Sequence, residues 1–236
     1  MLRGASRLLS FLAFSSLVLI AGKSLAAVAE PGKNLVAALV KAAPAADPKV
    51  LKLAVAAINC AQTHGLESSQ RLAVIDYSRA SAEPRLWVFD LNRQTLLYQE
   101  WVAHGRNSGD SYAHEFSNDP GSLQSSLGLF RTGDTYQGHN GYSLRMDGLE
   151  AGINSNALER AIVMHGAPYV SAEMARAQGR VGRSWGCPAL RTGVARQVID
   201  KLKGGQFVFA YYPDQRWLGS SAYLHCNAPS NKLAQS

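Results

Sequence analysis

The sequence predicts a mainly β protein with a short N-terminal helical segment and one helix late in the chain. Apolar residues recur at helical spacing before residue 66, whereas from residue 71 onward they alternate or form the short runs typical of strands. Turn residues such as Gly, Pro, Asn and Asp separate these runs. We therefore expect consecutive strands to form a meandering, mainly antiparallel sheet.

The first residues have the pattern of a signal peptide. Two arginines precede an apolar stretch over residues 8–22, and small residues allow cleavage after Ala26 or after Ala29. The stretch is shorter than the roughly 20 residues of a membrane-spanning helix, which favours cleavage over a retained anchor. We expect residues 1–26 (or 1–29) to be removed, leaving an exported protein of the periplasm or cell envelope with no integral membrane segment.

Residues 30–66 are expected to form two short helices. Asp47 is a suitable N-cap for the second helix, Pro48 suits its first position, and Gly65 suits its end. This N-terminal helical segment precedes a domain over residues 70–213.

Seven segments of that domain are predicted to be strands. They are residues 71–78, 85–92, 95–105, 127–136, 142–148, 161–166 and 206–213. Residues 214–236 are expected to be a C-terminal tail.

Between the last two strands, the chain is expected to form a helix that opens at Pro188 and ends at Gly204. Four residues spaced along one helical face make its buried side, namely Val194, Val198, Ile199 and Leu202.

Charge and motifs exclude several classes of function. The formal net charge of +7 includes Arg3, Arg7 and Lys23, so subtracting three leaves +4 after cleavage. No dense Lys and Arg block interleaved with aromatics occurs, so nucleic acid is not an expected partner, whereas a mild positive charge suits an anionic polymer. No metal-binding or nucleotide-binding motif is present, so we expect neither a metal nor another cofactor.

Three cysteines in an exported chain leave at least one thiol unpaired. Cys187 lies in a turn-like run with Gly and Ser, whereas Cys60 ends a helical pattern and Cys226 lies in the tail. Cys60 and Cys226 are the natural disulfide pair, and the alternative is two buried free thiols.

Cys187, in the run RSWGCPAL, is the candidate nucleophile. Gly186 lets the backbone approach a substrate, and amides near a helix start both face an oxyanion and lower the pKa of a thiol. The candidate base is His165 at the end of a predicted strand, since the intervening residues are long enough to bring the two together. Taken singly, Cys187 is more simply explained as a buried structural cysteine, and His165 as a hydrogen-bonded histidine at a strand end.

A longer pattern surrounds these two residues. It comprises HG at 165–166, SWGCPAL at 184–190, VAHG at 102–105, SSLG at 125–128, YQGHNGYSLRMDGLE from 136 and NSNALERAIVMHGA from 154. Together the stretches resemble the murein L,D-transpeptidase catalytic-domain (YkuD-like) family, in the branch with SxGCPAL in place of SHGCxR. The resemblance covers roughly residues 70 to 212.

The resemblance implies a β-sandwich-like catalytic domain that acts without a cofactor on peptidoglycan stem peptides. In such a domain Cys187 attacks the carbonyl of an L-residue to form a thioester, which an amine or water resolves. His165 acts as general base, the amides of Gly186 and Cys187 form the oxyanion hole, and Ser184 orders the turn. We expect a monomer.

This sequence departs from much of the family beside the nucleophile. Trp185 stands where His is common, and no Arg follows the cysteine, so Arg183 or Arg191 is expected to bind the substrate carboxylate unless both are solvated surface charges. Trp185, His104 and His139 are further candidates for substrate binding. Alternatively, His104 hydrogen-bonds to a neighbouring strand or turn, and His139 is a polar residue of a Gly-rich turn.

Three functions stay open at this point. They are an L,D-transpeptidase, an L,D-carboxypeptidase or other cysteine peptidase acting on the same substrate, and a non-catalytic envelope binding protein with the same fold. The departures beside the nucleophile favour the third function, whereas the presence of both Cys187 and His165 argues against it.

Overall fold

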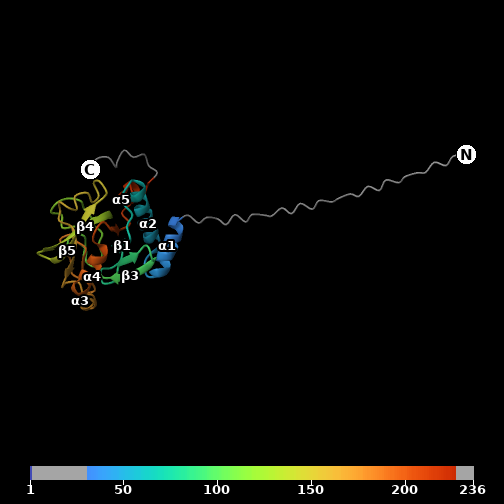
Figure 1. The fold of residues 1–236 in the computed structure, drawn as a ribbon. Helices are drawn as coiled ribbons and strands as arrows, with labels where there is room; N and C mark the ends of the chain where they lie inside the picture. The colour runs from blue at the N-terminus through green and yellow to red at the C-terminus, as the bar shows by residue number, and fades with distance from the viewer. Residues whose placement is uncertain (2–30, 227–236) are drawn as a thin grey trace.

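The computed structural model describes residue 1 and residues 31–226 (Figure 1). The elements in chain order are α1 (Pro31–Ala42), α2 (Pro48–Thr63), β1 (Arg71–Asp76), β2 (Leu86–Asp90), β3 (Thr95–Glu100), β4 (Gly128–Gly138), β5 (Gly141–Gly148), β6 (Val163–Ala167), α3 (Ala172–Gln178), β7 (Ala189–Arg191), α4 (Thr192–Leu202), β8 (Phe207–Tyr211) and α5 (Gln215–Ser220). The expected signal peptide and the last residues of the expected tail lie outside the described residues.

The strands form one eight-stranded sheet in the order β3-β2-β1-β8-β4-β5-β6-β7. Its pairs are antiparallel except for β1 with β8 and β6 with β7, which are parallel. The mainly β fold class and the mainly antiparallel pairing are confirmed. The simple meander is wrong, because β8 inserts between β1 and β4 and so joins the two halves of the sheet.

The residues after β3 connect the two outer edges of the sheet. The Ala103 N–H donates to Ala189 O of β7 over 2.9 Å, and Gly105 forms a parallel bridge with Ser184. Because β3 and β7 are the opposite edge strands, these contacts close the sheet on itself around a shared core. This closure gives the sandwich-like arrangement, and it brings the residues around 104 against the candidate nucleophile turn.

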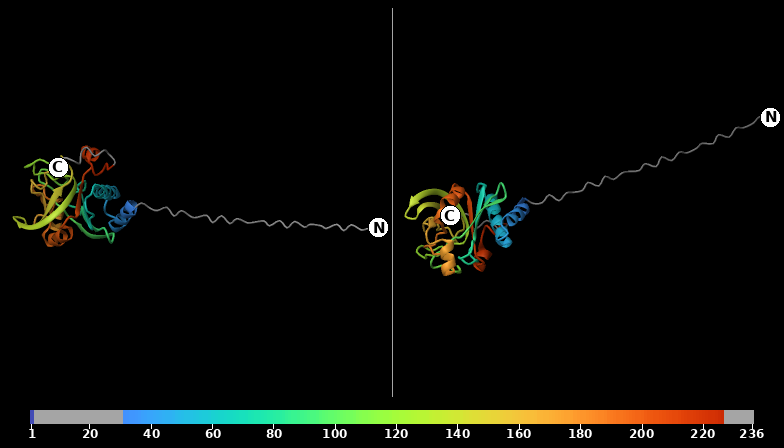
Figure 2. Two further views of the ribbon diagram at one scale, coloured as in Figure 1. Left: turned by 45° about the horizontal axis from the view of Figure 1, so that its top comes forward. Right: turned by 90° about the horizontal axis from the view of Figure 1, so that it is seen from below.

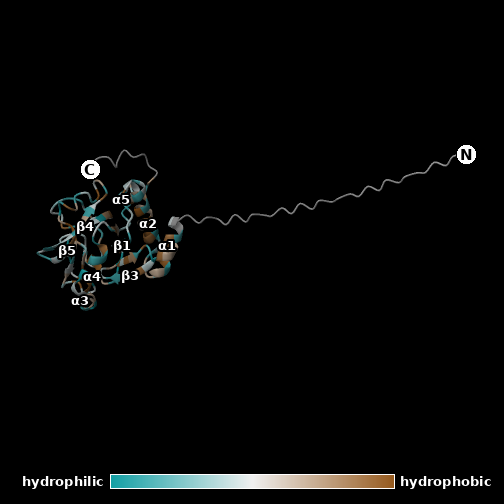
Figure 3. Cartoon of the chain, in the orientation of Figure 1, coloured by the Kyte–Doolittle hydropathy of each residue, from teal (hydrophilic) through white to brown (hydrophobic). Residues whose placement is uncertain are grey.

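Helices α1 and α2 pack against each other and against β1, β3 and β8. Figures 1 and 2 show them on one side of the molecule, with the β4–β5 hairpin on the other. The side chain of Asp47 accepts from Lys49 N over 2.8 Å, so the predicted N-cap of α2 is confirmed. Hydrophobic residues, brown in Figure 3, recur along both helices. No helix in the described part of the chain is sufficiently long and apolar to span a bilayer.

The helix that follows the candidate nucleophile begins later than predicted. Residues 189–191 form β7 against β6, and α4 starts only at Thr192, so the expectation that Pro188 opens the helix is wrong. The three residues of β7 are too few to show a strand period in the sequence. The predicted apolar face of the helix is buried as expected, at Val194, Val198, Ile199 and Leu202.

The chain after β8 folds back onto the domain. Trp217 of α5 is buried, and its indole N–H donates to the carboxylate of Glu150 over 3.1 Å. Cys226 forms a disulfide with Cys60 of α2, with the two Cα atoms 5.4 Å apart. Residues 214–226, expected as part of a tail, therefore pack on the domain in the structure.

Candidate active site

Cys187 and His165 lie on neighbouring segments at the β6–β7 edge of the sheet. His165 pairs with Ala189 in the parallel register of β6 with β7, and Ala189 comes two residues after Cys187. Both side chains are buried, with Cys187 8% exposed and His165 3% exposed. Strand pairing thus brings together the two residues that the sequence analysis selected.

The Cys187 sulfur is held by the residues that lead into β6. The Val163 N–H donates to Sγ over 3.4 Å, and the thiol donates to Ala161 O over 3.6 Å. Ala161 has φ of 53°, in the left-handed region that residues with a Cβ rarely adopt. No hydrogen bond joins Sγ to the ring of His165 in the described structure, so the thiol must turn from Ala161 O toward His165 before a proton can pass between them.

The His165 ring has the tautomer that a general base requires. Its Nδ1 lies 3.0 Å from Gly166 O, and a carbonyl oxygen can only accept, so Nδ1 carries the proton. The lone pair is therefore on Nε2. Burial lowers the pKa of His165 below its ordinary value, with the Gly166 hydrogen bond acting in the opposite direction. The ring is accordingly neutral at neutral pH and can accept a proton.

Burial raises the pKa of the Cys187 thiol above its ordinary value. The Val163 hydrogen bond and the positive charge of Arg160 oppose this rise without cancelling it. The expectation that a helix start lowers the thiol pKa is wrong, because β7 separates Cys187 from the start of α4. The resting pair is therefore a neutral thiol and a neutral imidazole.

Ser184 orders the turn that carries the nucleophile. Its hydroxyl accepts from Gly186 N over 3.1 Å and donates to Cys187 O over 2.6 Å. Gly186 has φ of 122°, and a Cβ at this position would lie 2.7 Å from Gln124 O, so only glycine fits the turn.

The two backbone amides expected to face an oxyanion differ in their hydrogen bonds. Because Gly186 N–H donates to Ser184, it cannot also face an oxyanion in this conformation, and the role expected for this amide is wrong here. No other residue in the described part of the chain accepts a hydrogen bond from Cys187 N–H, so it is the amide that can turn toward a substrate oxyanion.

The residues expected to contact substrate lie in different surroundings. Trp185 is 74% exposed beside the nucleophile. Arg183 is partly exposed and forms an ion pair with Asp110, with 3.3 Å between Nη1 and Oδ1. The guanidinium of Arg191 binds both carboxylate oxygens of Glu100, with 2.7 Å between Nε and Oε2. Both arginines are therefore already paired with internal carboxylates, and of the three side chains Trp185 is the most exposed.

His104 and His139 differ in their exposure to solvent. His104 is completely buried, accepts at Nδ1 from Arg85 over 2.7 Å, and lies 3.4 Å from Gly109 O at Nε2. Burial and the charge of Arg85 lower its pKa to about 3. The expectation that His104 binds substrate is wrong, because no surface of it is open, and the alternative of a hydrogen-bonded interior histidine holds. His139 is exposed at the tip of the β4–β5 hairpin.

Arg160 and Ser125 belong to the site but were not selected from the sequence. Arg160 lies close enough for its charge to lower the pKa of Cys187. The Ser125 hydroxyl donates to Gly186 O over 3.0 Å. Both lie in stretches that resemble the family, yet a serine and an arginine that bind backbone carbonyls leave no distinctive spacing.

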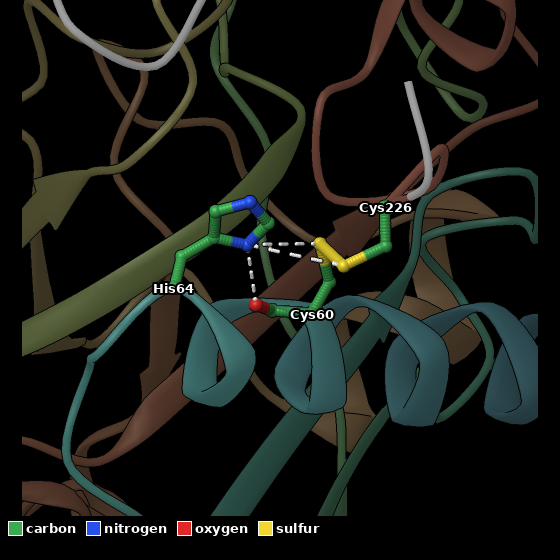
Figure 4. A group of neighbouring side chains, drawn as sticks. All are labelled: Cys60, His64 and Cys226. Carbon is green, nitrogen blue, oxygen red and sulfur yellow. Dashed lines mark hydrogen bonds between the residues drawn. A yellow bond between two sulfur atoms is a disulfide. The ribbon is translucent and has the colours of Figure 1, made fainter. Parts of the chain in front are cut away.

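One group in the described part of the chain has the donor atoms of a metal site. The donor atoms of Cys60, His64 and Cys226 lie within 4.8 Å of one another. Figure 4 shows the His64 ring facing the two sulfur atoms, which are bonded to each other. In this form the sulfurs are not thiolates, and His64 Nδ1 lies 2.8 Å from Cys60 O. The group is a disulfide with a neighbouring histidine.

Comparison with known proteins gives one family. Residues 42–211 match the family model of the L,D-transpeptidase catalytic domain. No curated protein matches the chain.

Several solved structures are similar at low identity. An L,D-transpeptidase from Mycobacterium smegmatis shares 13% identity over 61% of this chain and 60% of that chain, with a TM-score of 0.39. An L,D-transpeptidase from Stackebrandtia nassauensis shares 12% identity over 78% of this chain and 91% of that chain, with a TM-score of 0.37. The chain thus spans 60% of the length of the mycobacterial protein.

Proposed function

The chain belongs to the L,D-transpeptidase catalytic-domain family, and from this premise we propose that it is an exported cysteine acyltransferase acting on peptidoglycan stem peptides. The observation that carries the proposal is the pairing of β6 with β7, which sets the one free cysteine of the described chain beside a buried, neutral histidine. This arrangement supplies a nucleophile and a base without a metal or another cofactor.

The first half-reaction is acyl transfer to sulfur. His165 Nε2 takes the proton of the Cys187 thiol as Sγ attacks the carbonyl carbon of an L-residue in the stem peptide. The carbonyl oxygen becomes an oxyanion facing Cys187 N–H. When the C–N bond breaks, His165 returns the proton to the nitrogen of the departing D-residue, leaving a thioester on Cys187.

The second half-reaction releases the acyl group. An amine of a neighbouring stem peptide attacks the thioester carbonyl, His165 takes the proton of that amine, and the Cys187 thiol leaves with a proton. The new amide bond joins two stems. If water takes the place of the amine, the product is a shortened stem, which is the carboxypeptidase alternative.

A neutral resting pair suits this chemistry in a buried site. A thiolate and an imidazolium at rest would both need solvation that burial removes. In the proposed sequence the proton moves only as the carbonyl is attacked, when negative charge passes from sulfur to the substrate oxygen. The raised pKa of Cys187 and the lowered pKa of His165 both support this order.

Trp185 and Arg183 are the proposed substrate contacts. Trp185 offers an exposed apolar ring two residues before the nucleophile. Arg183 is paired with the exposed carboxylate of Asp110, whereas Arg191 is bound through two hydrogen bonds to the buried Glu100, so a stem-peptide carboxylate can exchange more readily at Arg183. Export to the periplasm or cell envelope and a monomeric state remain part of the proposal.

The product of a muropeptide incubation tests the function. Purified disaccharide-tetrapeptide is incubated with the mature chain and with its Cys187→Ala variant, and products are separated by mass. Cross-linked dimers from the wild type alone support transpeptidation, whereas shortened stems alone support the carboxypeptidase. Unchanged substrate with both proteins supports a non-catalytic binding protein.

A further inference from the structure

We propose that Arg160 is a positioning residue for Cys187: its guanidinium locks residues 117–126 in place, and these residues hold the turn that carries the nucleophile. The inference concerns the site of the proposed function, and one of its two tests does not depend on that function.

Every hydrogen bond of the Arg160 guanidinium reaches this one segment. Nη1 donates to Ser117 O over 2.5 Å and to Ser126 Oγ over 2.6 Å. Nη2 donates to Ser122 Oγ over 3.0 Å and to Gln124 O over 2.6 Å. The segment forms neither helix nor strand, so side-chain bonds replace the ladder that would otherwise fix it. The planar fork of arginine allows all four bonds at once.

The locked segment contacts the nucleophile turn directly. Ser125 is buried, and its hydroxyl donates to Gly186 O over 3.0 Å. The Ser125 hydroxyl oxygen also accepts from Gly105 N over 3.0 Å. Gln124 O lies only 2.7 Å from the position that a Cβ of residue 186 would take. Any displacement of residues 124–125 must therefore move Gly186, and with it Cys187.

Arg160 is also next in sequence to the residues that hold the sulfur. It is followed at once by Ala161, whose carbonyl accepts the Cys187 thiol, and Val163 N–H donates to the same Sγ. The turn is thus held through Ser125 and the sulfur through Ala161 and Val163. Arg160 binds the segment of Ser125 and is adjacent in sequence to Ala161. Its loss should therefore loosen both the backbone and the sulfur of Cys187.

The charge of Arg160 gives a second, separable effect. It lowers the pKa of the Cys187 thiol against the effect of burial. Tyr77 and Tyr169 are further titratable groups that interact with Cys187, and burial raises the pKa of each to about 12, so they stay neutral over the range of the test. A lysine at residue 160 would keep the charge and lose the fork.

The test compares Arg160→Met, Arg160→Lys, Ser125→Ala and the double variant Arg160→Met with Ser125→Ala. Alkylation of Cys187 by iodoacetamide is followed against pH, and kcat and KM are measured on disaccharide-tetrapeptide. The matched control is Arg131→Met, since Arg131 donates to Glu67 O over 2.7 Å and covers the ring of Phe207 away from the site. Thermal melting reports the folding of every variant.

The proposal predicts that Arg160→Met shifts the alkylation profile to higher pH and lowers kcat at least about 10-fold with little change in KM. Arg160→Lys should restore the alkylation profile but not kcat. The double variant should be no slower than its slower parent, because Arg160 and Ser125 act in series.

Three outcomes would overturn the proposal. The first is that Arg160→Met matches Arg131→Met in both its alkylation profile and its kcat. The second is full recovery of kcat in Arg160→Lys, and the third is additive losses of kcat in the double variant. If Arg160→Met fails to fold, the kcat values of Arg160→Lys and Ser125→Ala still test the proposal. If the wild type turns over no muropeptide, the proposed function fails, while the pH profile of alkylation still tests whether Arg160 acts on the Cys187 thiol.

Discussion

The Val163 N–H donates to the Cys187 sulfur over 3.4 Å, so the strand that carries the proposed base also holds the proposed nucleophile. Val163 is the first residue of β6, and His165 is the third. Side chains two apart on a strand point to the same face, whereas a register shift of one residue would turn His165 to the opposite face. The pairing register of β6 and β7 is therefore the structural requirement of the proposed chemistry.

Replacing His165 by Gln should remove general-base catalysis while leaving the fold intact, because the ring's one hydrogen bond is to the adjacent Gly166 O. We expect the rate of thioester formation at neutral pH to fall roughly 10²- to 10⁴-fold. Rapid-quench mass spectrometry measures this rate. The control is His225→Gln, an exposed histidine after α5 whose ring lies 2.7 Å from Leu218 O, which should keep the wild-type rate. Equal losses in the two variants would contradict the assignment of the base.

Replacing Gly186 by Ala should distort the nucleophile turn. The added Cβ would lie 2.7 Å from Gln124 O and 2.9 Å from Ile162 Cδ1, at a φ that alanine rarely adopts. We expect at least about 10-fold slower thioester formation and a loss of roughly 1–3 kcal/mol in the free energy of unfolding. Gly193→Ala is the matched control, since its Cβ would meet nothing within 4 Å. A fully active Gly186→Ala protein would show that the turn does not need glycine.

The buried His104 should make the fold sensitive to acid. Its pKa is about 3 in the folded state against an ordinary value of 6.5, so the unfolded chain binds a proton that the folded chain excludes. This contribution to stability is complete above pH 6.5 and is lost as pH falls toward 3, at up to about 1.4 kcal/mol per pH unit. His165, whose pKa is also lowered, acts in the same direction.

Urea denaturation between about pH 7 and about pH 4.5 measures this loss. In a His104→Asn variant, the amide oxygen replaces Nδ1 as acceptor from Arg85 without titrating, so the free energy of unfolding should fall less steeply with acid. Identical slopes for the variant and the wild type would rule out His104 as the source.

Removing the disulfide should cost stability and leave the chemistry in place. Cys60 and Cys226 are 166 residues apart in sequence, so their bond restricts a long loop of the unfolded chain. We expect the Cys60→Ser, Cys226→Ser double variant to lose roughly 2–5 kcal/mol in the free energy of unfolding while Cys187 remains acylated at 25 °C. Dithiothreitol should destabilise a Cys187→Ala protein equally, and an unchanged melting curve in both cases would contradict this role.

Strand positions were accessible from the sequence, whereas strand order was not. Alternation and turn residues predict each longer strand, because local burial determines them. The position of β8 in the middle of the sheet depends on its contacts with β1 and β4, far away in the chain. The closure by Ala103 and Ala189 likewise involves small residues whose pairing no local pattern encodes.

In the site, too, residue identities could be proposed from the sequence, whereas their surroundings could not. Cys187 and His165 were proposed from residue type and motif, but their pKa directions depend on burial, which comes from the tertiary structure. His104 was misassigned because its motif gives no measure of its depth in the core. Arg160 was missed because all four of its hydrogen-bond partners are serine hydroxyls or backbone carbonyls of one irregular segment.

The central claim is that Cys187 becomes acylated by a stem peptide, and intact-protein mass spectrometry tests it most directly. The mature chain and its Cys187→Ala variant are incubated with disaccharide-tetrapeptide and quenched in acid. The account predicts that the wild type alone gains the mass of a disaccharide-tripeptide acyl group, located on Cys187 and released by hydroxylamine. A wild-type protein of unchanged mass beside unchanged muropeptides would contradict it.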